Sequence, residues 1–279
     1  MSNKKKILIS ATIKEKPIVL VEYFQSLKNL EKDDFEISYF FIDDNSNPNA
    51  SKLIYDFKDA NPNVVIEKPC TDDENTFKEN LEAQIDRTED DSNFSHVWTY
   101  GLIDRIAIIK NRILEYAKEN DFDYLFFVDS DIYLDPKTLV QLVSDEKDLV
   151  SNVFWTKWDE KSVEMPQVWL QDQYNMFNVR GTGSKEEQTV AFLNQLREPG
   201  LYKIGGLGAC TLISKKVLQS GVNYDRITSV SFWGEDRYFS IRAEVLGFER
   251  FVDTHYPSFH IYREPDMEAL KMYKKNILI

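Results

Sequence analysis

The stretch from Tyr124 to Asp131 reads YLFFVDSD, and it decides the fold more clearly than any other part of the chain. Its first five residues are apolar or aromatic without alternation, a pattern typical of a strand that is buried on both faces of a sheet. Asp129 and Asp131 follow this run directly. Because ligands bind outside the carboxyl ends of strands in open α/β sheets, the stretch predicts a central strand that ends at a ligand site.

The spacing of these two aspartates is weak evidence when it is taken alone. The chain has 25 aspartates among 279 residues, and about two D-x-D patterns are expected by chance at that frequency. Asp121 and Asp123 form a second such pattern. They lie in a polar stretch before the apolar run, where solvated carboxylates are ordinary. Position, rather than pattern, therefore distinguishes Asp129 and Asp131.

A divalent cation would explain why two carboxylates follow one strand. Like charges this close repel each other unless a cation offsets them. Hard oxygen ligands favour Mg²⁺ or Mn²⁺, which can bridge phosphate oxygens. The alternative is that the pair begins a turn and caps the next helix, a task that Asp135 could perform instead. We expect metal binding.

The residues before this strand predict an α/β fold. Apolar runs at 6–10, 37–42 and 64–66 indicate strands, and apolar residues at helical spacing over 18–30 and around 53–57 indicate helices between them. This alternating order is typical of a parallel sheet with helices on both faces. A longer helix is predicted over 102–118, directly before the central strand.

The second half of the chain predicts further elements around a loop-rich lobe. Strands are expected at 149–154 and 211–213, and a helix is expected to open at Asp135-Pro136, with proline near its first position. Residues 155–183 hold three tryptophans without a clear period, which indicates a recognition lobe with little regular structure. Residues 70–100 form a longer segment that is polar and acidic over 70–93, and we interpret it as a surface excursion.

Composition limits the possible partners and the location. The chain has 47 acidic and 34 basic residues, a formal charge of −13, and no basic stripe interleaved with aromatic residues, which argues against binding nucleic acid. The apolar run at Ile7–Ile9 is too short for a signal sequence or a membrane span, so a cytoplasmic protein is expected. Cys70 and Cys210 are predicted to be buried small residues. Without repeats or linkers, 1–279 is predicted to be one domain.

Two further segments are candidates for donor binding. The turn at Asp43–Asn47 closes the second strand, and its residues are those that any tight turn favours. The alternative is that a carboxylate, Asp44, accepts a hydrogen bond from a nucleobase. Backbone contacts to the same base would come from Ala11, Thr12 and Ile13, which we place in the loop after the first strand.

Glu235, Asp236 and His260 are candidates for the chemistry itself. Acidic residues favour the first turn of a helix through the helix dipole, and this alone would explain Glu235-Asp236. The alternative is a general base that takes a proton from an attacking hydroxyl. His255 and His260 follow a strand-like stretch at 250–252, and a histidine is more often structural than a ligand. With a cation already expected, His260 is predicted to be the third metal ligand.

Taken in order, these segments resemble the GT-A glycosyltransferases, and specifically glycosyltransferase family 2. The resemblance extends from about Lys6 to His260. It rests on Ile42–Ser46, Arg105, Lys110-Asn111, Val128–Leu134 with Pro136, Gly205-Gly206, Ala209, Gly234–Asp236, Arg242-Ala243, Leu246–Phe248 and His260.

The resemblance implies a fold and a role for each matched residue. The fold would be a GT-A domain, a Rossmann-like α/β architecture whose mostly parallel central sheet is flanked by helices. Residues 1–135 would bind the donor, and 136–279 would hold the acceptor and the catalytic groups. The implied donor-binding residues are Ala11, Thr12, Ile13, Asp44, Arg105, Lys110, Asp129 and Ser130. The implied metal ligands are Asp131, Asp129 and His260, with Asp236 as the base and Glu235 beside it.

The predicted function is a metal-dependent, inverting transfer of a sugar from a nucleotide-diphosphate donor to a hydroxyl group. A UDP-sugar is the expected donor, Mn²⁺ or Mg²⁺ the expected cofactor, and a glycan, a protein or a lipid the acceptor. A phosphohydrolase of the haloacid-dehalogenase type is the first alternative, although it usually carries its D-x-D on the first strand, with threonine or valine at the position of Tyr133. A sugar-nucleotide pyrophosphorylase is disfavoured because the glycine-rich first loop is missing at 11–16. A non-catalytic sugar-nucleotide-binding module is the third alternative.

Overall fold

The computed structural model describes residues 4–32, 35–69, 100–159, 161–230 and 234–277. Eight strands form the main sheet: β1 (Lys6–Ile13), β2 (Glu36–Asp43), β3 (Val64–Glu67), β4 (Tyr124–Phe127), β6 (Leu149–Asn152), β9 (Leu201–Ile204), β10 (Thr211–Ser214) and β11 (Arg250–Asp253). Two small antiparallel sheets pair β5 (Ile132–Tyr133) with β12 (Phe259–His260) and β7 (Trp155–Thr156) with β8 (Met165–Pro166). The helices are α1 (Pro17–Asn29), α2 (Pro48–Ala60), α4 (Tyr100–Glu119), α5 (Thr138–Ser144), α6 (Lys185–Gln195), α7 (Lys215–Leu218), α8 (Glu235–Val245) and α9 (Asp266–Ile277).

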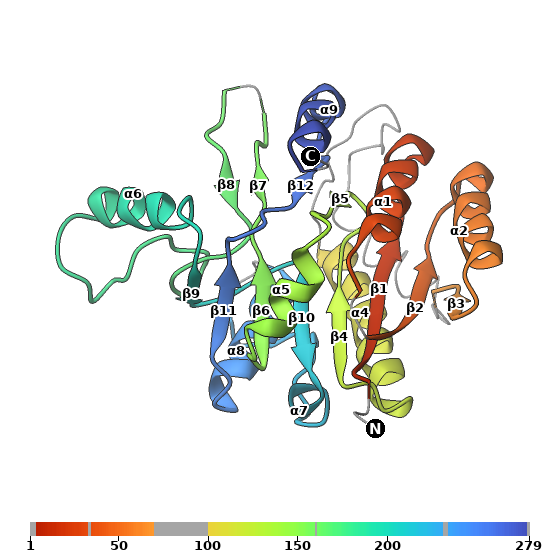
Figure 1. The fold of residues 1–279 in the computed structure, drawn as a ribbon. Coiled ribbons are helices and arrows are strands. Elements are labelled where there is room, and N and C mark those ends of the chain that lie inside the picture. Colours follow the sequence, from red (N-terminus) through yellow and green to blue (C-terminus); the bar gives the residue numbers. More distant parts are fainter. Residues whose placement is uncertain (1–3, 33–34, 70–99, 160, 231–233, 278–279) are drawn as a thin grey trace.

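The main sheet has the strand order β3-β2-β1-β4-β10-β6-β11-β9. Its first four strands are parallel to one another, β10 is antiparallel to both of its neighbours, and β6 and β11 are again parallel. The carboxyl ends of β1, β2 and β4 therefore meet at one edge, which lies at the top in Figure 1. The predicted α/β fold with a mostly parallel central sheet is confirmed, and β4 lies inside the sheet as expected.

Alternating side chains of the strands build one hydrophobic core on each face of the sheet. On β1, Ile7 and Ile9 pack with residues of α1, α2 and α5, whereas Leu8 packs with residues of α4, α7 and α8 on the opposite face. Figure 1 shows the same two layers of helices. Because both faces of the sheet are covered, its strands can be continuously apolar, as 124–128 are.

Local sequence explains where the first helices begin. Pro17 and Pro48 occupy the first turns of α1 and α2, where the missing amide hydrogen costs nothing. Asn47 caps α2, because its side chain accepts a hydrogen bond from the Asn49 amide at 2.9 Å. The Asp43–Asn47 turn thus connects β2 to α2.

The structure corrects one predicted boundary and adds two helices. α5 begins at Thr138 rather than at Pro136, because Asp135 accepts a hydrogen bond from the Lys137 amide and forms a turn first. Helices α6 and α9 were not predicted. The lobe at 155–183 contains β7 and β8 but little other regular structure, as expected. The expected surface excursion falls almost entirely on 70–99, which lies outside the described residues, as does Cys70, whereas Cys210 is buried as predicted.

Candidate active site

The strand pair β5 and β12 brings His260 to the second aspartate of the D-x-D pattern. Its register places His260 opposite Ile132, and the Ile261 amide donates a hydrogen bond to the Asp131 carbonyl at 2.9 Å. As a result, Nε2 of His260 lies 3.0 Å from Oδ2 of Asp131. On the other side of the ring, Nδ1 lies 2.8 Å from the hydroxyl of Thr156 in β7. Two segments 129 residues apart in sequence are thereby joined.

Acidic groups gather around this pair and perturb one another. Burial of His260 opposes its protonation, but the carboxylates of Asp131, Asp129 and Asp266 together outweigh this effect and raise the pKa of the imidazole. Burial, and then the charge of Asp131, raise the pKa of Glu15 to about 7. Burial also raises the pKa of Asp129 to about 6, with the Lys110 charge opposing and Asp131 adding to the increase. Carboxyl groups with pKa values this high are typical of functional sites.

A second cluster lies at the start of α8. The buried ammonium of Lys110, on α4, donates hydrogen bonds to Oε1 of Glu235 at 2.7 Å and to Oδ1 of Asp236 at 2.8 Å. The Glu235 side chain is 5% exposed and that of Asp236 is 24% exposed, so solvent reaches mainly Asp236. Lys110 was predicted to bind the nucleotide, but the structure pairs it with the two acids instead.

The environment of Asp236 suits a general base. Burial raises its pKa to about 7, Lys110 opposes that increase, and Glu235 adds to it. A base is most effective when its pKa lies near the working pH. Gly208 lies beside the second carboxylate oxygen, since a Cβ at this position would be 3.2 Å from Oδ2 of Asp236. Gly208 therefore leaves room at the exposed side of the carboxyl group.

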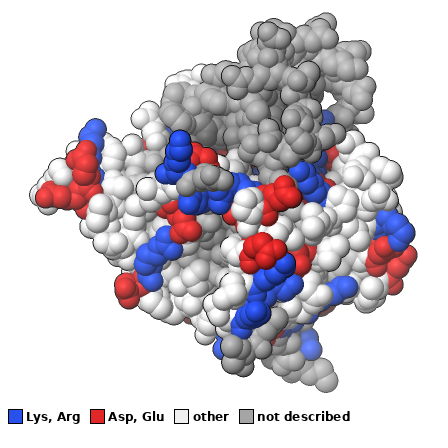
Figure 2. Space-filling model, turned by 90° about the horizontal axis from the view of Figure 1, so that it is seen from above, with Lys and Arg blue, Asp and Glu red and all other residues white. Residues whose placement is uncertain are grey.

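Asp129 connects the two clusters electrostatically. Its pKa depends on Asp131 and His260 on one side and on Lys110 and Glu235 on the other. The charge of Asp129 in turn raises the pKa of Asp236. The D-x-D pattern, His260 and the Glu235-Asp236 pair, which are remote in sequence, thus share one site. Figure 2 views the molecule from above this edge and shows acidic and basic side chains interspersed on the part of the face that is not grey.

Asp44 and Arg105 form an ion pair at the same edge. Arg105, on α4, donates hydrogen bonds from two nitrogens to the two carboxylate oxygens of Asp44, one of them at 3.3 Å. The Asp44 amide also donates to the carbonyl of Ile13 at 2.8 Å. Asp43 has a structural role, because it is buried and accepts hydrogen bonds from Lys68 and Asn45. Asp44 and Arg105, which were predicted to contact the nucleotide, therefore hold each other in place.

The first predicted donor-binding segment lies in a strand rather than in a loop. Ala11, Thr12 and Ile13 belong to β1 and pair with β2, so they are not in a loop as expected. Ala11 and Ile13 are fully buried in the core. Thr12 differs, because its buried hydroxyl has no hydrogen-bond partner and its carbonyl lies 3.5 Å from the hydroxyl of Ser130. The loop after β1 begins at Lys14 and carries Glu15.

Three residues near the site were missed at the sequence level. Glu15 had no pattern to distinguish it. Thr156 reaches His260 because β7 packs against β12, two segments that are distant in the sequence. Tyr174 lies in the lobe, where its hydroxyl would be 3.1 Å from a Cβ at Gly234. Its pKa is raised by burial and then by the charge of Asp236. The density of aromatic residues in 155–183 was the one available signal for Tyr174.

The donor groups present fit a divalent cation. Asp129 and Asp131 offer hard oxygen atoms and His260 a nitrogen atom, the ligand types that Mn²⁺ accepts. Burial is the main cause of the raised pKa of Asp129, and the positive charge of Lys110 offsets it only in part. Within the described residues, no three His, Cys, Asp or Glu side chains are arranged as a complete metal site. This is compatible with Mg²⁺-type binding, in which one or two carboxylates act together with water and substrate phosphates.

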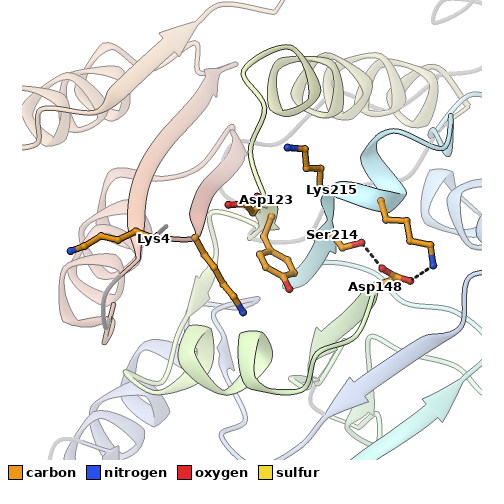
Figure 3. A pocket seen from close by; sticks show the side chains of 8 residues that line it. Lys4, Asp123, Asp148, Ser214 and Lys215 are labelled. Atoms are coloured by element: carbon orange, nitrogen blue, oxygen red, sulfur yellow. Dashed lines mark hydrogen bonds and ion pairs between the residues drawn. The ribbon is translucent and has the colours of Figure 1, made fainter. Parts of the chain in front are cut away.

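A separate hollow lies at the opposite end of the sheet. It has a volume of about 410 Å³ and is lined by lysines from the N-terminus and α7, together with Asp123, Tyr124, Asp148 and Ser214. Asp148 accepts hydrogen bonds from the Ser214 hydroxyl at 2.8 Å and from the Lys216 ammonium at 3.0 Å. Figure 3 shows Asp148 beside Ser214. Lys215 pairs in turn with Asp121 at 2.7 Å. Asp121 and Asp123, the second D-x-D pattern, thus lie at the end of the sheet away from the candidate site.

The sheet order and the helices on both faces form a GT-A-type α/β fold, which confirms the predicted fold. Among solved structures, that of residues 1–349 of S. aureus TarS is similar, with a TM-score of 0.51 and 14% identity over 91% of this chain and 60% of that chain. The same protein in complex with UDP-GlcNAc gives a TM-score of 0.50 and 14% identity over 93% of this chain and 59% of that chain. The chain thus spans less than two thirds of these structures.

Comparison at the level of sequence gives no family. No protein-family model matches the chain, and neither does any curated protein. In the part of the chain that the structure describes, no helix is long and apolar enough to cross a membrane. The predicted cytoplasmic location, the single-domain organisation and its division near residue 135 remain predictions.

Proposed function

We propose that the chain is a glycosyltransferase that moves a sugar from a nucleotide-diphosphate donor to an acceptor hydroxyl group, with inversion at the anomeric carbon. The observation that supports this most strongly is the position of Asp129 between two clusters. One cluster, Asp131 with His260, has the chemistry to bind a cation. The other, Glu235 with Asp236, has a partly exposed carboxyl group with a pKa of about 7. A cation-assisted leaving group and a general base are the two requirements of a single displacement.

The proposed reaction is a single displacement in which Asp236 is the base. Asp236 takes the proton of the acceptor hydroxyl, while the acceptor oxygen forms a bond to the anomeric carbon. The bond between this carbon and the diphosphate oxygen breaks, and the nucleoside diphosphate leaves with the electron pair. The transition state has oxocarbenium character, as in other glycosyl transfers. Attack from the side opposite the leaving group inverts the configuration.

Asp131 and His260, with Asp129 beside them, are proposed to hold Mn²⁺ or Mg²⁺ together with water and the phosphates of the donor. A cation held there would offset the charge on the diphosphate of the donor. Without it, the acidic residues at this edge would repel that group, and the formal charge of −13 would add to the repulsion. A cation at this position would thus allow an acidic protein to bind an anionic donor.

The nucleoside would lie along the ends of β1 and β2. Asp44, fixed by Arg105, is the proposed acceptor of a hydrogen bond from the base. Ser130, whose hydroxyl lies 3.5 Å from the Thr12 carbonyl, is proposed to contact the donor as well. A UDP-sugar is the proposed donor, and the similarity in fold to a structure that was solved with UDP-GlcNAc supports this choice. Tyr174 and the aromatic residues of 155–183 would line the acceptor side, since aromatic faces suit sugar rings.

The proposal is tested by incubating the protein with a panel of nucleotide-sugars and Mn²⁺, without an added acceptor. Slow release of the nucleoside diphosphate, with water as the acceptor, is expected from one donor. Asp236→Asn should retain donor binding and lose this release. Release of inorganic phosphate from p-nitrophenyl phosphate would instead indicate a phosphohydrolase. Binding of donors without turnover by the wild-type protein would indicate a non-catalytic module.

A further inference from the structure

We propose that Lys110 is a positioning residue, which holds the carboxylate of Asp236 at the reacting centre through one oxygen and does not contact the donor nucleotide. This inference rests on the proposed function, because it assumes that Asp236 is the base. It assigns a purpose to the contact between α4 and the start of α8. It also replaces the role that the sequence suggested for this lysine.

The geometry around the ammonium group leaves little room for another ligand. Its hydrogen bonds to Glu235 and Asp236 are 2.7 and 2.8 Å long, and its side chain is only 7% exposed. The rings of Phe127 and Tyr224 lie 5.6 and 5.1 Å from it. A lysine ammonium has three donor hydrogens, and two of them are used. A phosphate group would have to displace a buried carboxylate to reach this nitrogen.

The two acids are held unequally. Glu235 is at least as buried as Lys110 and completes the ion pair, whereas Asp236 uses only Oδ1 for this contact and has the larger exposed fraction. Its other oxygen faces Gly208. The lysine thus fixes the side-chain rotation of Asp236 while one oxygen remains available for an acceptor hydroxyl group. Glu235 neutralises most of the remaining positive charge, so Asp236 keeps its basicity.

Several titratable groups face Asp236, and their charges predict opposite effects for two substitutions. They are Lys110 from α4, Glu235 from its own helix, Asp129 after β4, Tyr174 from the lobe and Tyr224 before α8. Burial raises the pKa values of both tyrosines, so they stay neutral. Lys110 lowers the pKa of Asp236, whereas Glu235 and Asp129 raise it. Removing the lysine and removing the glutamate must therefore shift this titration in opposite directions.

The experiment follows the side-chain carboxyl carbon of Asp236 by NMR in protein with ¹³C-labelled aspartate, and Asp236→Asn identifies the signal. Lys110→Met should move the titration of this carboxyl group upward by about 1–3 pH units, the usual effect of one close charge. Glu235→Gln should move it downward. This readout needs no turnover, so it tests Lys110 even if the protein transfers no sugar.

Kinetics and binding provide the second arm. With a donor that is turned over, Lys110→Met should lower the rate at pH 7 by about tenfold or more. Part of the lost rate should return at higher pH, because the pKa of Asp236 is higher in this variant. Lys110→Arg, which keeps the charge, should return the profile towards that of the wild type. UDP affinity with Mn²⁺, measured by calorimetry, should change less than about threefold in Lys110→Met.

The opposite pattern would overturn the inference. An unchanged Asp236 titration together with a tenfold or greater loss of UDP affinity would identify Lys110 as a nucleotide ligand. If Lys110→Met does not fold because Glu235 is left unpaired, Lys110→Met/Glu235→Gln removes both buried charges, and a smaller upward shift of the Asp236 titration is expected. A downward shift in this double variant would equally contradict the inference. Undiminished turnover of Asp236→Asn would instead refute the proposed base and leave the NMR result for Lys110 valid.

Discussion

At the scale of single residues, the raised pKa of Asp236 makes a direct kinetic prediction. Burial is its main cause, and the resulting value is about 7. A general base works only when it is deprotonated, so the rate should be nearly constant above this pH. Below it, the rate should fall about tenfold per pH unit. A profile of UDP release between pH 5 and 9 checks this prediction, and a rate that stays constant down to pH 5 would exclude Asp236 as the base.

The pair of His260 with Asp131 predicts that nucleotide binding depends on metal. In the wild-type protein, Mn²⁺ should strengthen UDP binding by at least about tenfold, a difference of about 1.4 kcal/mol. Asp131→Ala and His260→Ala should each lose most of this gain, as measured by calorimetry with and without Mn²⁺.

His255→Ala provides the matched control for the metal prediction. This histidine lies five positions earlier, is 39% exposed and binds Asp253 at 2.6 Å rather than a residue of the site. Its removal should leave the Mn²⁺ effect unchanged. An Mn²⁺ effect that survives in His260→Ala and in Asp131→Ala would show that the cation binds elsewhere.

For single residues, the sequence identified site residues that directly follow an apolar strand. It did not reveal contacts between segments that are distant in the chain. Asp129 and Asp131 could be selected because an apolar strand precedes them. His260 could be proposed as a partner, but its contact with Asp131 depends on the pairing of β5 with β12, two strands of two residues each. Lys110 matched a motif, yet its buried contacts with Glu235 and Asp236 span more than a hundred residues of sequence. Glu15 lies in a loop without any pattern.

At the scale of elements, Gly205-Gly206 determines how the lobe packs against the sheet. The Trp169 amide donates a hydrogen bond to the Gly206 carbonyl at 3.1 Å. A Cβ on Gly206 would collide with the Trp169 indole ring, and one on Gly205 would collide with the Leu170 backbone. A second contact fixes the lobe to α8, because Arg237 donates two hydrogen bonds to Asp172, at 2.7 and 2.8 Å.

Gly206→Ala should therefore lower the free energy of unfolding by about 1–3 kcal/mol, the usual cost of overpacking. Chemical denaturation monitored by tryptophan fluorescence would measure this loss. Gly200→Ala is the matched control, since the atom nearest to its added methyl group is the hydroxyl oxygen of Tyr202, the far end of a side chain. Equal losses in the two variants would show that the indole contact is not the cause.

Helices were predictable where their apolar face was long and regular, as in α1 and α4. Helix α6 was missed because it is mostly exposed and buries only Phe192. A signal for it does exist, since Ser184 and Glu187 form a capping box at its start. The start of α5 was placed two residues early because proline is also common in a turn, and here Asp135 stabilises that turn.

At the scale of the whole molecule, buried acidic groups make stability depend on pH. Burial, and then the charge of Asp253, raise the pKa of Asp145 to about 6. The folded state therefore binds this proton more tightly than the unfolded state, whose aspartates titrate near pH 4. The stabilising contribution is complete below about pH 4 and is lost as the pH rises through about 6.

Asp145→Asn should flatten the decline in the free energy of unfolding between pH 4 and pH 7. The expected difference is about 1 kcal/mol, because solvent screens this partly exposed group. Urea denaturation at several pH values measures it, with Asp59→Asn on the exposed side of α2 as the control. An identical decline in the free energy of unfolding in the wild type and in Asp145→Asn would show that Asp145 does not cause it.

The overall architecture was largely predictable, because alternating strands and helices with fully apolar strands leave few arrangements other than a parallel sheet covered on both faces. The antiparallel direction of β10, inside the sheet, was not predictable. It depends on the connection through the lobe, which carries no periodic signal. The antiparallel edge strand β9 was not recognised for the same reason.

The claim that this fold transfers sugars is tested most directly by comparing the wild type with Asp236→Asn on a panel of UDP-sugars in Mn²⁺. For each protein, both donor binding and UDP release are measured. We predict that both proteins bind the same donor with similar affinity, and that only the wild type releases UDP, with a loss of about 10²–10⁴-fold in the variant. Equal release by the two proteins, or no binding of any UDP-sugar by the wild type, would contradict this account.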